Sequence, residues 1–149
     1  MPATVVDDHL LRDILVGRRD ETLDGLAPDG VATTGLWLFR LCSSFAAPTV
    51  VGKLSGPVAS LPEDLQGRFR AQLVALSPSI EVLRLRDMAW PMALLQARHR
   101  AGGRSLSAAM VEALAAAHLL GRGIAVSHND VGPNLFAAVE ADGVVFHVL

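Results

Sequence analysis

Apolar positions in this chain fall into short continuous runs separated by longer segments with helical spacing. The short runs predict strands at residues 3–6, 31–34, 80–85, 124–127 and 144–148. Between the strands, apolar spacing and capping residues predict helices at residues 8–16, 36–45, 63–76, 91–99, 105–120 and 133–141. Strands that alternate with helices are typical of a parallel sheet covered by helices on both faces. We therefore expect a three-layer α/β/α fold with a mostly parallel central sheet.

Polar and turn-forming residues interrupt this pattern in two places. Residues 17–30 and 48–62 are rich in Gly, Pro, Ser and charged side chains, so we expect both segments to be irregular. Pro91 is placed in the first turn of its helix, because proline lacks the N–H that an interior helical position needs. The helix at residues 105–120 begins after Ser105 or Ser107, either of which is a suitable N-cap.

The composition fits one compact domain of 149 residues. Hydrophobic residues make up 51% of the chain, which excludes a disordered protein, and charged residues interrupt them too often for a membrane span. The first residues lack the pattern of a secretion signal, and Cys42 is the only cysteine. We therefore expect a cytoplasmic protein that does not bind membranes. A net charge of -2 argues against bulk electrostatic binding of nucleic acid.

Acidic side chains lie within a few residues after two of the predicted strands. Asp7 and Asp8 follow the first strand, and Asn129 and Asp130 follow the fourth. The carboxyl ends of parallel strands border the crevice where α/β folds usually bind ligands. If these two strands are neighbours, Asp7 and Asp130 share that crevice with Glu112. Such oxygen ligands suit Mg²⁺ or Mn²⁺, which activate water and neutralise phosphate charge.

Glu112 is the only charged residue in an otherwise apolar helix. A helix that is apolar almost all round is buried, and an unpaired buried carboxylate costs several kcal/mol. Glu112 therefore needs a partner, and the candidates are a cation such as Arg40, a bound metal, or water in a cleft. A carboxylate on the solvent-exposed edge of a mostly buried helix is the simpler alternative.

The order of these motifs resembles the PIN-domain family, small α/β nucleases best known as bacterial toxin ribonucleases. Residues 5–11 (VVDDHLL) resemble the family's opening strand, aspartate and helix. Residues 112–130 resemble its acid, alanine-rich helix, glycine turn and strand, followed by Ser and then Asn or Asp. Residues 137–149 are similar to its closing helix and strand, whereas the middle of the chain matches little.

The resemblance implies a metal-dependent endoribonuclease. Asp7, Glu112 and Asp130 would bind Mg²⁺ or Mn²⁺ and activate water for cleavage of RNA. The alignment near Asp130 is uncertain by one residue, so Asn129, followed by Asn134, is an alternative. If the protein is a toxin, the resemblance further implies a homodimer and an antitoxin bound near the cleft.

One position departs from the family pattern. The family carries a glutamate on its second helix, where this chain has Arg40. An arginine among the acids would replace a metal by charge pairing. The alternative function is therefore a catalytically degenerate PIN-like domain that binds nucleic acid or a protein partner. We expect Arg40 to pair with a site carboxylate, with Asp8 as a further group near the site.

Two other features of the chain bear on function. The basic run that contains Arg100 and Arg104 is expected to contact phosphates if it faces the acidic pocket, and is otherwise a solvated turn. The opening VVDDH also resembles a response-regulator receiver. That fold needs a phosphoacceptor aspartate after a middle strand and a late lysine, and neither is present, since Lys53 is the only lysine.

Overall fold

A five-stranded parallel sheet forms the centre of the protein. The computed structural model describes residues 4–18, 21–28, 30–46 and 52–149. The strands are β1 (Thr4–Val6), β2 (Val31–Thr34), β3 (Ile80–Leu83), β4 (Ile124–Val126) and β5 (Phe146–Val148). Their order is β3-β2-β1-β4-β5, and every neighbouring pair is parallel.

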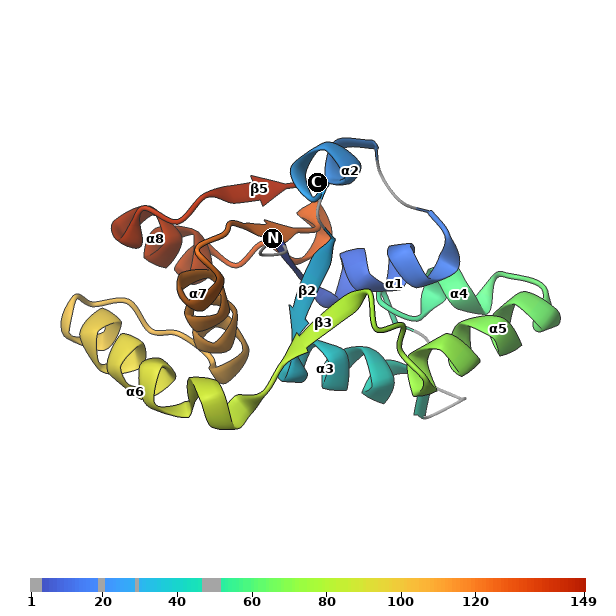
Figure 1. Ribbon diagram of the computed structural model, residues 1–149, viewed down its shortest axis with the longest axis horizontal. Coiled ribbons are helices and arrows are strands. Elements are labelled where there is room, and N and C mark those ends of the chain that lie inside the picture. The colour runs from blue at the N-terminus through green and yellow to red at the C-terminus, as the bar shows by residue number, and fades with distance from the viewer. Residues whose placement is uncertain (1–3, 19–20, 29, 47–51) are drawn as a thin grey trace.

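Helices connect the strands. They are α1 (Asp8–Val16), α2 (Glu21–Leu26), α3 (Gly35–Ala46), α4 (Gly56–Ala59), α5 (Glu63–Val74), α6 (Leu85–Ala101), α7 (Ala108–Leu120) and α8 (Pro133–Asp142), with a 3-10 turn η1 (His128–Asp130). In Figure 1, α6, α7 and α8 lie to the left of the sheet, and α1, α4 and α5 lie to its right.

The sheet separates two hydrophobic cores because successive side chains of a strand point to opposite faces. Val5 packs with side chains of α6, α7 and α8 on one face. Val6, the next residue, packs with side chains of α1, α4 and α5 on the other. The α3 helix contributes to both cores, with Trp37 in the first and Leu41 in the second. This arrangement confirms the predicted three-layer α/β/α fold.

The direction in which the chain winds reverses between β1 and β4. From β1 the chain adds β2 and then β3 on one side, and it then returns to place β4 on the other side of β1. Neighbouring loops diverge at such a switch point, which opens a crevice at the carboxyl ends of the strands. The first and fourth strands are neighbours, with Val5 in register with Ile124, so the condition for a shared crevice after these strands is met. The crevice therefore lies where Asp7 follows β1.

Several sequence predictions differ from the structure. Residues 17–30 contain the helix α2, because burial of Leu23, which is 1% exposed, stabilises a helix in a segment of loop composition. Likewise, residues 48–62 contain the short helix α4, while residues 48–51 lie outside the described residues. The final strand is shorter than predicted and begins at Phe146.

The α6 helix begins at Leu85, six residues before the predicted start at Pro91. Pro91 lies inside the helix, where its missing N–H leaves the carbonyl of Asp87 without a helical hydrogen bond. Met88 is fully buried in the first turns, and this burial offsets the cost of an interior proline. No helix in the described part of the chain is long and apolar enough to cross a membrane.

Candidate functional site

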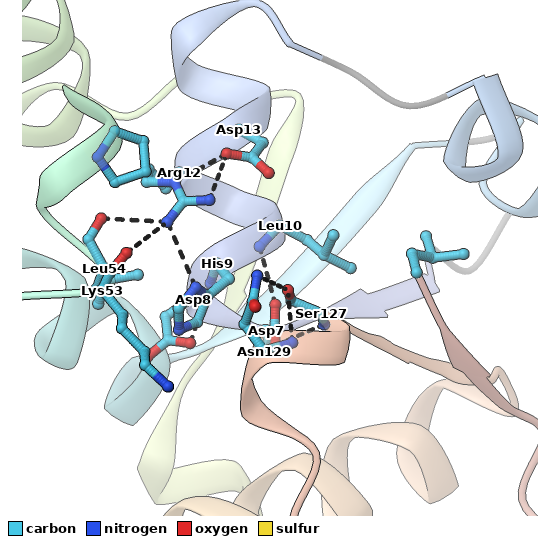
Figure 2. A network of polar contacts seen from close by, with 12 residues as sticks. Asp7, Asp8, His9, Leu10, Arg12, Asp13, Lys53, Leu54, Ser127 and Asn129 are labelled. Carbon is cyan, nitrogen blue, oxygen red and sulfur yellow. Dashed lines mark hydrogen bonds and ion pairs between the residues drawn. The ribbon is translucent and has the colours of Figure 1, made fainter. Parts of the chain in front are cut away.

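Asp7 links β1 to β4 at the switch point. Its Oδ1 accepts a hydrogen bond from the N–H of Leu10 at 2.9 Å, and its Oδ2 accepts one from the N–H of Ser127 at 2.9 Å. Figure 2 shows the Asp7 carboxylate between the start of α1 and the segment that carries Ser127 and Asn129. The residue is 1% exposed. Both carboxylate oxygens therefore hold backbone amides that the fold would otherwise leave unpaired.

The local sequence explains the position of Asp7. It has the extended backbone conformation of an N-cap (φ -77°, ψ 178°), and its side chain bonds the third N–H of α1. Aspartate is among the best N-cap residues, since its oxygen accepts from an otherwise unpaired amide. Capping alone needs one oxygen, so the second is available to Ser127. The sequence indicated the cap but not this second contact.

Asp8 and Arg40 form an ion pair beside Asp7. The Oδ1 of Asp8 accepts a hydrogen bond from the N–H of His9 at 3.0 Å, and its Oδ2 lies 3.3 Å from the Nε of Arg40. The Asp8 side chain is fully buried, whereas that of Arg40 is 47% exposed. Arg40 thus compensates the charge of a buried carboxylate on α1 and keeps part of its guanidinium in solvent.

Glu112 caps the start of α3. The predicted alternative in which it pairs with Arg40 is not what the structure shows. The Glu112 Oε1 accepts a hydrogen bond from the N–H of Leu36 at 3.1 Å, in the first turn of α3. Glu112 is 1% exposed on α7, so its carboxylate bridges two helices. A negative charge is favourable at a helix N-terminus, where amide groups are unpaired and the dipole is positive. This contact supplies the partner that a buried carboxylate requires.

A cavity of about 260 Å³ lies at this edge of the sheet. Polar side chains from several elements line it, together with apolar ones; they are Asp7, Trp37, Arg40, Ser107, Ala109, Met110, Val126, His128, Asn129, Val131, Gly132 and Leu135. Glu112 does not line it. Among its described lining residues, the cavity therefore combines the carboxylate of Asp7 and the guanidinium of Arg40 with hydroxyl, amide and imidazole groups and with apolar side chains.

A second cavity of about 300 Å³ shares His128 and Asn129 with the first. Arg12 and Arg18 belong to its lining, and Arg18 is exposed. His128 and Asn129 therefore contribute to two adjoining hollows at the carboxyl edge of the sheet. Arginines line both of them.

The segment after β4 contains the remaining predicted ligands. Asn129 is exposed, and its Nδ2 lies 3.4 Å from the Oγ of Ser127. Asp130 ends the 3-10 turn η1, and its side chain lies outside the described part of the structure. Asn134 is exposed in the first turn of α8 and does not line the cavity beside Asp7. Of the three predicted metal ligands, the structure describes the side chains of Asp7 and Glu112.

The described acids do not form a metal site. Asp7 and Glu112 hold backbone amides of different helices, and Asp8 is paired with Arg40. Among the side chains that the structure describes, no three carboxylate, imidazole or thiol groups are arranged to hold a metal ion. The described side chains alone therefore do not supply the set of oxygen ligands that Mg²⁺ or Mn²⁺ would need, and the side chain of Asp130, the third predicted ligand, lies outside the described part of the structure.

The predicted basic run is at the other edge of the sheet. Arg104 donates from Nε to the Nδ1 of His99 at 2.7 Å, and His99 Nε2 lies 3.2 Å from Asp142 Oδ2. Asp142 lines a third cavity together with residues that precede β4 and β5, at the amino ends of the strands. Arg104 is therefore remote from the acids after β1, and Arg100 is exposed on α6.

Asp142 connects three helices that cover one face of the sheet. Its Oδ2 also lies 2.7 Å from Arg98 on α6 and 2.8 Å from the Nε2 of His118 on α7. Burial raises the pKa of Asp142, but hydrogen bonds from His118 and His99 and the charge of Arg98 outweigh it, so the pKa is lowered. Because Arg104 donates to His99 Nδ1, the Nε2 of His99 carries the hydrogen that faces Asp142.

A further buried network, on α1, was not anticipated from the sequence. Arg12 is 6% exposed and donates to Asp13 at 2.8 Å and to the carbonyls of Lys53 and Leu54 at 3.3 and 3.2 Å. Figure 2 shows this arginine on α1, one turn from His9. It connects α1 to the segment before α4. The adjacent Arg12 and Asp13 were the only sequence signal for it.

No protein-family model matches the chain, and a search of curated proteins finds no match.

Proposed function

We propose that this protein is a PIN-like domain that binds single-stranded RNA at the carboxyl edge of its sheet and does not cleave it. The ion pair of Arg40 with Asp8, at 3.3 Å, carries the proposal. Where the PIN resemblance leads one to expect a glutamate, this chain has a cation that pairs with an acid next to Asp7. A guanidinium in this position compensates carboxylate charge that a metal would otherwise compensate.

The contacts of Asp7 and Glu112, the two predicted metal ligands whose side chains the structure describes, support a role for these carboxylates without a metal. Asp7 and Glu112 are each 1% exposed, and each accepts hydrogen bonds from backbone amides at a helix start. Carboxylates that bind one metal ion must direct their oxygens toward the same position. Asp7 and Glu112 instead direct oxygens to backbone amides of two different helices, α1 and α3. Their positions are thus explained by the stability of the fold.

The chemistry of the two adjoining hollows supports RNA as the ligand. Arg40 lines one hollow and Arg18 lines the other, while His128 and Asn129 belong to both. Arginine is well suited to phosphate contacts, and amide and imidazole groups suit the exposed edges of unpaired bases. A protein of net charge -2 needs such a local set of cations in order to bind RNA.

Binding of a fluorescent single-stranded RNA, measured by anisotropy at low salt, tests the proposal. We expect affinity to fall with rising salt, and to fall at least about 5-fold in Arg40→Ala and in Arg18→Ala through loss of a phosphate contact. Arg68→Ala, in an exposed part of α5, is the matched control and should bind like wild type. Equal affinity of all four proteins would contradict the proposal.

A metal-dependent endoribonuclease is the second candidate. The observation in its favour is that two buried carboxylates, Asp7 and Glu112, both lie at the carboxyl ends of the strands. The same RNA, incubated with Mn²⁺ or with EDTA, separates the two candidates. Cleavage that requires Mn²⁺ and disappears in folded Asp7→Asn and Glu112→Gln variants would establish the nuclease. Uncleaved RNA that is nevertheless bound supports the first proposal.

A further inference from the structure

The α6 helix carries apolar side chains on two opposite faces. On the inner face, Met88 and His99 are fully buried, and Met92 and Leu95 pack against the core between them. The spacing of these residues, at i, i+4, i+7 and i+11, is that of one helical stripe. This stripe fixes α6 against the rest of the domain.

A second stripe with the same spacing begins two residues later. It consists of Trp90, Leu94, Ala97 and Ala101, and two positions correspond to a rotation of about 200° around the helix. Trp90 is 72% exposed and Leu94 is 53% exposed, and both alanines are exposed. We call these four residues the outer stripe. In Figure 1, α7 lies between α6 and the strands β2 and β3, and the exposure of these four residues makes the outer stripe accessible.

Exposed arginines flank one edge of the outer stripe near its two ends. Arg86 and Arg100 are each seven residues from Ala93, so all three lie on one side of the helix. Both arginines are exposed, and neither forms an ion pair with any residue that the structure describes. Other charges nearby are compensated, since Asp87 pairs with Arg84 at 3.1 Å. The outer stripe is therefore apolar along its length and has a positive charge beside it near each end.

We propose that the outer stripe binds an acidic amphipathic helix of a protein partner. An exposed apolar stripe on a helix is complementary to the apolar face of another helix, with anchors at i, i+3, i+4 and i+7. Arg86 and Arg100 favour a partner helix that carries acidic residues at its two ends, because these residues would form ion pairs with the two arginines. This proposal does not depend on RNA binding at the other site.

The same charges disfavour the other occupants. In an antiparallel pair of α6 helices centred on Ala93, Arg86 of one copy would meet Arg100 of the other, and in a parallel pair identical arginines would meet. Like charges that face each other across an interface are unfavourable. An anionic membrane attracts clusters of about four to eight cations, whereas this face has two unpaired ones. A protein helix with acids at its ends satisfies both the apolar stripe and the charges.

Trp90 provides a direct probe of the outer stripe, because the only other tryptophan, Trp37, is 4% exposed. The test titrates the full-length protein with a synthetic amphipathic helical peptide that has leucines at i, i+3, i+4 and i+7 and glutamates at both ends. A second peptide with lysines in place of the glutamates is the matched ligand. We expect a saturable blue shift of tryptophan emission with the acidic peptide and a dissociation constant of order 10 μM.

Variants of the protein then assign the contact. The double variant Arg86→Glu, Arg100→Glu should weaken binding of the acidic peptide at least about 10-fold while circular dichroism stays unchanged. Arg68→Glu with Arg70→Glu, which makes the same charge change on exposed α5, should bind like wild type. Leu94→Ser should also weaken binding, without removing the probe.

Four outcomes would overturn the proposal. The first is no emission shift with the acidic peptide, and the second is equal binding of both peptides. The third is a shift that depends on protein concentration alone and accompanies a doubled mass in light scattering, which would identify a second copy as the occupant. The fourth is a shift with phosphatidylserine vesicles in place of the acidic peptide, which would identify a membrane surface.

Discussion

Asp7 accepts a hydrogen bond from the backbone N–H of Ser127 at 2.9 Å, although 120 positions separate the two residues in the chain. The contact crosses the switch point between β1 and β4, where the winding of the sheet reverses. The other oxygen of the same carboxylate caps α1. One side chain therefore holds together the two halves of the sheet at the edge where the candidate site lies.

Replacing Asp7 tests this structural role. Asp7→Ala leaves the amides of Leu10 and Ser127 without their acceptor, and it should lower the free energy of unfolding by about 3 kcal/mol. Urea denaturation followed by circular dichroism measures the loss. Asp64→Ala removes an exposed acid from the first turn of α5 and should cost less than about 1 kcal/mol. Similar costs for the two variants would refute the role of Asp7.

The stability of the protein should depend on both the charge and the length of the Glu112 side chain, to different extents. Glu112→Gln keeps an oxygen for the amide of Leu36, so we expect a cost of about 1 kcal/mol from the lost interaction with the α3 dipole. Glu112→Ala removes the acceptor and leaves a cavity, so it should cost about 3 kcal/mol. Glu140→Ala, at an exposed position of α8, is the control for thermal unfolding. Equal stability of the Gln and Ala variants would show that the contact with Leu36 is unimportant.

The pair of Asp8 and Arg40 should have a measurable coupling energy. A double-mutant cycle with Asp8→Asn and Arg40→Ala should give about 1 kcal/mol, a value limited by the solvent exposure of half of the arginine side chain. The pair of Arg84 and Asp87, which is exposed on both sides, should give about 0.3 kcal/mol in the same urea experiment. A coupling energy for Asp8 and Arg40 no larger than this reference would mean that the ion pair is not maintained in solution.

Stability at acid pH should depend on Asp142. Its pKa in the folded protein is below its ordinary value of 3.8, because hydrogen bonds from His118 and His99 outweigh the effect of burial. The stabilisation is therefore complete above the pKa of the unfolded chain and is lost as pH falls through the folded pKa. Asp142→Asn should be less stable than wild type at neutral pH, and the difference should shrink below about pH 4.

Urea denaturation of both proteins between neutral and acid pH measures this effect. Asp64→Asn, which changes an exposed aspartate, should follow the wild-type profile. A stability difference between wild type and Asp142→Asn that stays constant over the whole range would contradict the lowered pKa.

Local patterns were sufficient to predict most of the fold. The α1 helix begins and ends as predicted, because Asp7 is a strong N-cap and Gly17 has the positive φ of 83° that suits glycine at a helix end. Ser107 caps α7, as one of the two predicted alternatives. Tertiary burial decided the exceptions. Met88 extends α6 past Pro91, and Leu23 stabilises α2, and neither contact is visible in local sequence.

The candidate site was less predictable because backbone groups complete it. The sequence identified Asp7, Glu112 and Arg40 as residues that need explanation. It did not show that the partners of Asp7 and Glu112 are amides of Ser127 and Leu36, since every residue except proline carries the same donor. Which amide is unpaired and near a carboxylate depends on how the helices are placed on the sheet.

Direct titration with Mn²⁺ tests whether Arg40 takes the place of a metal at the carboxyl edge of the sheet. Electron paramagnetic resonance measures free Mn²⁺ in the presence of wild type, Asp7→Asn and Arg40→Glu, each checked for folding by circular dichroism. We expect no stoichiometric binding by wild type, and we expect Arg40→Glu, which replaces the cation by an acid beside Asp8, to bind more Mn²⁺ than wild type. Stoichiometric binding by wild type that is lost in folded Asp7→Asn would show that Asp7 holds a metal and that Arg40 does not replace it.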